Sequence, residues 1–109
     1  MLLYRRNQAG IGVSMVVGMG IIEFRIHDCR SLKEKRRIVK PIIHQIQTHF
    51  NVSVAEVGAQ DVYQKAEIGF SLVGTNRRTI NAKIDKLLNM VEDLGLAEVV
   101  NSDMEIINI

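Results

Sequence analysis

The sequence predicts an α+β domain whose elements follow the order βαββαβ, with an antiparallel sheet covered on one face by two helices. Three observations predict this class: stretches in which every second residue is apolar, two stretches with apolar residues at helical spacing, and a helix-capping residue before each helical stretch. The chain has 109 residues, of which 47% are hydrophobic and 24% charged, and this suits one globular core. We expect a single domain over residues 15–109 after a loosely ordered leader over residues 1–14.

The first strand is expected over residues 16–27, where the apolar residues recur with a period of two. One face of this strand carries Val16, Gly18, Gly20, Ile22, Phe24 and Ile26, and the other carries Glu23, Arg25 and His27. Glycine is a poor strand residue, so the two glycines on the apolar face indicate that a helix or a neighbouring backbone approaches closely there.

The first helix is expected to begin at Ser31, because Ser31 and Glu34 fit a capping box in which both side chains accept hydrogen bonds from backbone N–H groups. Apolar residues then recur at helical spacing as far as Asn51: Leu32, Val39, Ile42, Ile43, Ile46 and Phe50. Pro41 lies inside this stretch. Since proline removes one backbone hydrogen bond, we expect one bent helix.

Two strands are expected over residues 52–57 and 65–73, joined by a hairpin connection over residues 58–64. The connection carries three polar candidates for a site, Gln60, Asp61 and Gln64. They either form a hairpin-specific site or serve turn formation, with the glutamines bridging strands or a neighbouring subunit.

A second helix follows, capped by Thr75 or Asn76 and ending at Gly95, and residues 98–109 supply the last strand. The apolar stripe of this helix consists of Ile80, Ile84, Leu87, Leu88, Val91 and Leu94. One layer of sheet and one layer of helices in this order form the ferredoxin-like sandwich.

The first helix also concentrates positive charge. Residues 30–40 hold six basic residues and one acidic residue, a local charge of +5 in a chain of net charge +2, which leaves −3 for the remainder. At about 100° per residue, one solvent-facing stripe carries Lys33, Arg36, Arg37 and Lys40, which we call the basic ridge, followed by His44 and Gln47. The ridge either binds the phosphates of a polyanion or is a solvated helix face. Lys35 lies beside the apolar stripe and either snorkels or meets a partner.

Arg77 and Arg78 open the second helix, where positive charge opposes the helix dipole. This placement either invites an anion or leaves two solvated arginines near acidic neighbours. We therefore add Lys35, Arg77 and Arg78 to the basic ridge as nucleic-acid-binding candidates.

Candidate catalytic and metal-binding residues are few. His27, Asp28 and Cys29 follow one another at the end of the first strand, where consecutive side chains diverge, and a single thiol makes a weak metal site. His44 and His49 are too far apart on the helix to share a metal. No phosphate-binding glycine motif, nucleotide fingerprint or nucleophile elbow appears. We expect a non-enzymatic protein with no metal and no cofactor.

The cellular compartment follows from the cysteine content and the N-terminal region. Cys29 is the single cysteine, so no intramolecular disulfide can form, and a reducing compartment fits. The apolar stretch over residues 9–22 follows Arg5 and Arg6 as in a signal peptide, but it continues into an alternating strand and is too short to span a bilayer. We expect a cytoplasmic protein with no membrane partner.

Three motifs carry a family resemblance: the helix start over residues 31–37, the strand motif over residues 50–57, and Gln60-Asp61. With these motifs the chain resembles the YlxP-like family, domain of unknown function 503, over about residues 16–107. The resemblance implies a small bacterial cytoplasmic protein of ferredoxin-like fold, often encoded near translation and ribosome-maturation genes, with no established activity. The short connection at residues 28–30 departs from the family pattern, in which many relatives carry a longer one with a proline.

Two functional hypotheses of different classes result. The first is a non-enzymatic RNA-binding or ribosome-associated protein whose basic ridge contacts phosphates. The second is a homo-oligomeric interaction module, a dimer being favoured, in which the open sheet face or the sheet edges pair with another copy. The residues expected to make this face polar and self-complementary are Glu23, Arg25, His27, Lys65, Glu67 and Ser71. An enzyme using His27 or Asp61 ranks last, because neither has an orienting partner.

Overall fold

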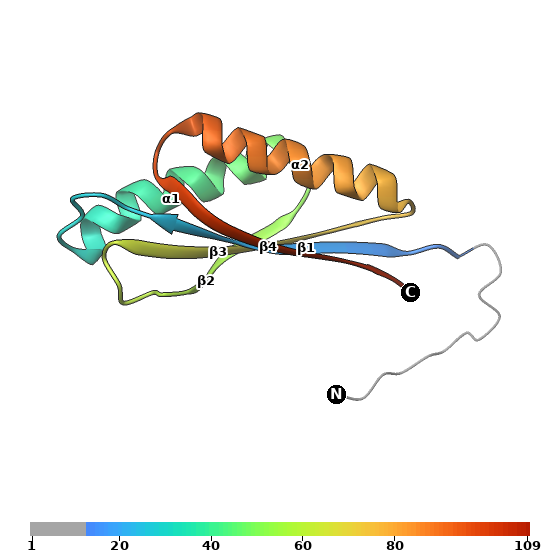
Figure 1. Cartoon of the computed structure of the whole chain (residues 1–109), viewed down its shortest axis with the longest axis horizontal. Helices are drawn as coiled ribbons and strands as arrows, with labels where there is room; N and C mark the ends of the chain where they lie inside the picture. Colours follow the sequence, from blue (N-terminus) through green and yellow to red (C-terminus); the bar gives the residue numbers. More distant parts are fainter. Residues whose placement is uncertain (1–12) are drawn as a thin grey trace.

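A computed structural model of the chain describes residues 13–109, and its elements follow the predicted order βαββαβ (Figure 1). The elements are β1 (Val16–Arg25), α1 (Leu32–His49), β2 (Ser53–Gly58), β3 (Lys65–Gly74), α2 (Arg77–Leu94) and β4 (Glu98–Asn108). The strands form one antiparallel four-stranded sheet in the order β2-β3-β1-β4, and both helices cover the same face (Figure 1). The ferredoxin-like α+β sandwich is therefore confirmed. The predicted leader lies outside the described residues, apart from its last two positions.

The capping box predicted for α1 is present. The backbone N–H of Glu34 donates to Ser31 Oγ at 3.1 Å, and that of Arg30 donates to Glu34 Oε2 at 2.7 Å. The helix continues through Pro41 as one element and buries Val39 and three other residues, Lys35, Ile42 and Ile46, against the sheet.

The ends of α2 follow the sequence signals. Asn76, and not Thr75, is the N-cap, and its side chain accepts from the backbone N–H of Thr79 at 3.2 Å. At the other end Gly95 adopts the left-handed conformation with φ of 64°, which glycine reaches without strain.

The close approaches predicted at the β1 glycines are confirmed. A Cβ atom at Gly18 would lie 2.6 Å from Ile80 Cγ2 of α2, and one at Gly20 would lie 2.7 Å from the ring of Phe70. Glycine at these positions therefore lets α2 and β3 side chains pack directly on the central strand.

The first strand ends two residues earlier than predicted. It stops at Arg25: Ile26 still donates its backbone N–H to Gln64 O in the hairpin connection, but Asp28 takes a left-handed φ of 58°, which turns the chain out of the extended conformation. His27 consequently lies in the connection between β1 and α1 and is not part of the sheet face.

The uncovered face of the sheet differs from the expected polar surface. Charged side chains occupy one end of it: Arg25, Glu23, Lys65 and Glu67. The other end carries the apolar side chains of Val17, Met19, Ile21, Val73 and Ile107, with the carboxylates of Asp103 and Glu105 beside Ile21 and Met19. The prediction of a polar mixed surface overlooked the apolar side chains at this end, because the residues between the core positions of β1 are themselves apolar.

Candidate nucleic-acid interface

The basic ridge lies on the face of α1 that points away from the sheet. Its four side chains, Lys33, Arg36, Arg37 and Lys40, are all exposed and line a shallow hollow together with Pro41. None of the four forms an ion pair with any group in residues 13–109. With a rise of about 1.5 Å per residue, the ridge extends about 10 Å along the helix axis. It offers several free cations in a row.

The rest of α1 holds the ridge in place. Val39, Ile42 and Ile46 are at most 4% exposed and attach the opposite side of the helix to the core. Ser31 caps the N-terminus, whose partial positive charge adds to the potential near Lys33. The ridge is therefore a preorganised electropositive surface on a rigid element.

Lys35 does not belong to this surface, which corrects its place among the nucleic-acid-binding candidates. Its side chain is 2% exposed, and Nζ donates to Ala59 O at 2.6 Å. Nζ also lies 2.9 Å from Glu56 Oε2, as an ion pair rather than an aligned hydrogen bond. The partner of Lys35 is thus the end of β2 and the turn that follows, not an external phosphate.

The polar candidates of the hairpin connection have separate roles. Gln64 Nε2 donates to Cys29 O at 2.8 Å, which bridges the connections before α1 and before β3. Gln60 Nε2 donates to Glu56 O at 3.3 Å within its own turn. These contacts favour the interpretation in which the glutamines serve turn formation and bridging, while Asp61 is exposed.

Arg77 and Arg78 are not brought together with the basic ridge. The start of α2 lies at the opposite end of the helical layer from the start of α1 (Figure 1). Arg77 Nη1 donates to Ile106 O at 3.0 Å and to Asn108 Oδ1 at 2.8 Å, so its guanidinium holds the end of β4. Arg78 is exposed and makes no ion pair within the described part of the chain.

The structure also separates His27, Asp28 and Cys29. His27 is exposed, with Nε2 2.7 Å from Glu98 Oε1, whereas Cys29 is buried with Sγ 3.4 Å from Ser31 O. His49 Nδ1 lies 2.9 Å from Gln45 O of its own helix. Over residues 13–109, no group of three or more His, Cys, Asp or Glu side chains is placed to hold a metal ion.

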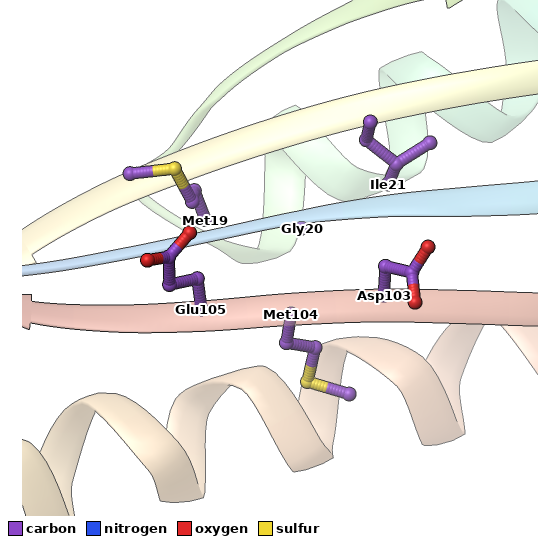
Figure 2. Close-up of a pocket in the computed structure, with 6 residues that line it drawn as sticks. All are labelled: Met19, Gly20, Ile21, Asp103, Met104 and Glu105. Atoms are coloured by element: carbon purple, nitrogen blue, oxygen red, sulfur yellow. The ribbon is translucent and has the colours of Figure 1, made fainter.

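A second surface, which the sequence reasoning missed, is a hollow between β1 and β4 on the sheet. Figure 2 shows Met19 and Ile21 of β1 beside Asp103 and Glu105 of β4, while Met104 points to the other side, towards α2. The sequence signal was available, because Val17, Met19 and Ile21 also recur with a period of two.

No helix among residues 13–109 is both long and apolar enough to cross a membrane.

The solved structures that resemble this chain include two weak similarities. A de novo designed protein, Foldit4, aligns with a TM-score of 0.45 and 18% identity over 89% of this chain and 97% of its own. LarC2, the C-terminal domain of a cyclometallase involved in the synthesis of the NPN cofactor of lactate racemase, aligns with a TM-score of 0.47 and 12% identity over 89% of this chain and 58% of its own. Neither similarity supports a statement about function.

Comparison of sequences is more informative. The uncharacterized protein YlxP of Bacillus subtilis (strain 168) is 34% identical over 77 residues, which cover 71% of this chain and 84% of that protein. The model of the family described as "Protein of unknown function (DUF503)" matches residues 17–104. The motifs at the start of α1 and along β2 fall within this match, and the chain belongs to the DUF503 family.

Proposed function

We propose that this protein is a non-enzymatic cytoplasmic factor that binds RNA, free or within the ribosome, through the basic ridge. The observation that supports the proposal is the set of four exposed cations on one face of α1, without ion-pair partners in residues 13–109. Helix faces that are only solvated commonly intersperse acidic residues with the basic ones. Glu34, the single acidic residue of α1, instead accepts a hydrogen bond at the helix start.

The chemistry of the ridge predicts how it binds. Each Lys or Arg that neutralises a phosphate releases condensed counterions, so affinity falls as salt rises. Four contacts correspond to a slope of about −3 in log K against log salt, a loss of about 50- to 150-fold between 50 and 200 mM. This dependence distinguishes phosphate binding from apolar association.

Among the groups that read RNA bases, the ridge carries only the guanidinium groups of Arg36 and Arg37. It contains no aromatic side chain, and the one aromatic residue at the end of α1, Phe50, is half-buried against the core. Contacts to phosphates alone position a protein without specifying sequence. We expect recognition of the RNA backbone and its shape, with little preference among sequences.

The distribution of charge orients the protein on such a ligand. The ridge forms a positive pole, and the edge strand β4 carries exposed acidic residues, Glu98, Asp103 and Glu105. A polyanion attracts the first surface and repels the second, so α1 meets the RNA first.

The test compares two variants with the same loss of charge. One removes three ridge cations (Arg36→Gln, Arg37→Gln, Lys40→Gln), and the other removes three exposed cations of α2 (Arg78→Gln, Lys83→Gln, Lys86→Gln). Binding to purified ribosomal subunits and to a structured RNA is measured across a salt series. We expect the ridge variant to lose most binding and its salt slope to flatten by about 2 to 3, while the α2 variant stays close to wild type.

Equal losses in both variants would show that only net charge matters and would contradict a role for the ridge. A loss confined to the α2 variant would move the site to Arg78 and its neighbours. Absence of salt-dependent binding by the wild-type protein would reject the proposal.

A further inference from the structure

The uncovered face of the sheet has the composition of an interface. In the cross-strand register, Val17 of β1 lies between Val73 of β3 and Ile107 of β4. Val73 is 61% exposed, Ile21 45% and Ile107 38%. Contiguous apolar surface of this kind on a soluble protein marks a site of association.

We propose that this face binds the same face of a second copy of the chain, giving a two-fold symmetric dimer packed sheet to sheet. The proposal concerns a surface on the opposite side of the molecule from the basic ridge and does not depend on RNA binding. Helices cover only the other face of the sheet (Figure 1).

The shape of the face suits a self-complementary contact, in which the same patch on both copies must supply both projections and hollows. The central strand provides a row of projecting apolar side chains, Val17, Met19 and Ile21. Beside this row, a hollow over β2 and β3 is bordered by small residues, Ser53, Ala55, Gly69 and Ser71. With the two-fold axis along β1, the two rows pack against each other, and β4 of the second copy lies over β3 beside this hollow.

The charges at the other end of the face are compatible with the same arrangement. When the two-fold axis runs along β1, the β3 side of one copy faces the β4 side of the other. Lys65 then faces Glu98 of the second copy, and Val73 faces Ile107 of the second copy, each pair occurring twice by symmetry. Opposite charges and apolar side chains are thus matched between the flanking strands β3 and β4, whereas Glu23 and Arg25 of β1 each face their own copies across the axis.

The area of the face determines how much of it a stable dimer must bury. With about 3.3 Å per residue and about 4.8 Å between strands, the four strands present a footprint of about 600 Å² per copy. Two such faces bury about 1,200 Å², the lower limit for stable specific interfaces. The dimer therefore requires both the apolar end and the charged end.

Pairing through the exposed edge of β4 is less compatible with the structure. An antiparallel pair of β4 strands about their middle places Asp103 opposite its own copy, and like charges opposite each other destabilise a sheet. The register shift between Glu23 and Phe24 also places an irregularity in β4, a feature that discourages edge pairing.

The first experiment measures mass in solution for the full chain without RNA, by sedimentation velocity over a range of concentrations. We expect about twice the 12.3 kDa of one chain at micromolar concentrations. Val73→Asp or Ile21→Asp should raise the dissociation constant at least about 30-fold, because the new carboxylate faces the apolar Ile107 of the second copy in the first variant and its own copy in the second. Leu96→Asp is the matched control, since Leu96 is 42% exposed in the connection after α2, away from the sheet face.

A second experiment tests the orientation. Lys65→Glu should weaken the dimer, and the exchange Lys65→Glu with Glu98→Lys should restore it. A wild-type protein that stays monomeric, or a dimer that survives both aspartate substitutions on the face, would overturn the proposal. Circular dichroism of each variant confirms that a loss of mass is not a loss of fold.

Discussion

Lys33 and Lys35 are two residues apart on α1, and the fold places them in opposite environments. Lys33 is exposed, whereas Lys35 is buried between the helix and the end of β2, where its ammonium meets Ala59 O and Glu56. The side chain of Glu56 is 25% exposed, so this ion pair keeps partial access to water. Lys35 therefore fixes the turn after β2 beneath the start of α1.

Replacing Lys35 by alanine should destabilise the protein strongly. The substitution leaves the Glu56 carboxylate and Ala59 O without their buried partner, and we expect the free energy of unfolding to fall by about 2–4 kcal/mol, somewhat less than for a fully buried pair. Urea denaturation followed by circular dichroism measures the change. Lys33→Ala is the control and should change stability by no more than about 0.5 kcal/mol. Equal stabilities of the two variants would mean that the buried contact contributes nothing.

At the scale of the element, α1 contains a proline that its packing does not explain. Pro41 is exposed, and a proline inside a helix leaves the carbonyl of the residue four positions earlier, Arg37, without its usual N–H partner. Arg37 belongs to the basic ridge, and Pro41 borders it.

Pro41→Ala should therefore stabilise the protein, by about 1–2 kcal/mol, because alanine restores the helical hydrogen bond and part of this gain is offset by the freer unfolded chain. The measurement is the midpoint of urea unfolding, with Gln47→Ala as a control on the same exposed stripe. A loss of stability would show that α1 needs a bend at Pro41 to pack on the sheet.

The elements themselves could be predicted because their signals are local. The capping box at Ser31, the glycine after α2 and the period of two in β1 act through residues within a few positions of one another. The order of elements then leaves few topologies, and the ferredoxin-like sandwich followed from it.

The contacts that define the surfaces could not be predicted in the same way. Lys35 meets Ala59 24 positions later, and Gln64 meets Cys29 35 positions earlier, so neither pair shows in the local pattern. The apolar side of β1 was overlooked for a different reason: Val17, Met19 and Ile21 alternate with core residues that are equally apolar or glycine. Only the position of the helices decides which of the two sides is covered.

At the scale of the whole molecule, the two proposed surfaces lie on opposite sides. In a sheet-to-sheet dimer the two α1 helices form the outer layers, and the layer spacings separate the two basic ridges by about 40 Å. A short oligonucleotide cannot reach both ridges, whereas a long folded RNA can. The dimer would therefore bind long RNA bivalently.

This geometry predicts a dependence on RNA length. Wild-type protein and the monomeric Val73→Asp variant should bind a 10-base-pair RNA duplex, about 30 Å long, equally well, because each duplex is shorter than the distance between the ridges and contacts one of them. For a folded RNA longer than about 60 nucleotides, we expect the wild type to bind at least about tenfold more tightly at low salt, since the second contact is intramolecular. Fluorescence anisotropy above the dimer dissociation constant measures both. A loss of affinity for the short RNA in the Val73→Asp variant would show instead that the sheet face itself contacts RNA, and equal affinities for the long RNA would show that the two ridges do not act together.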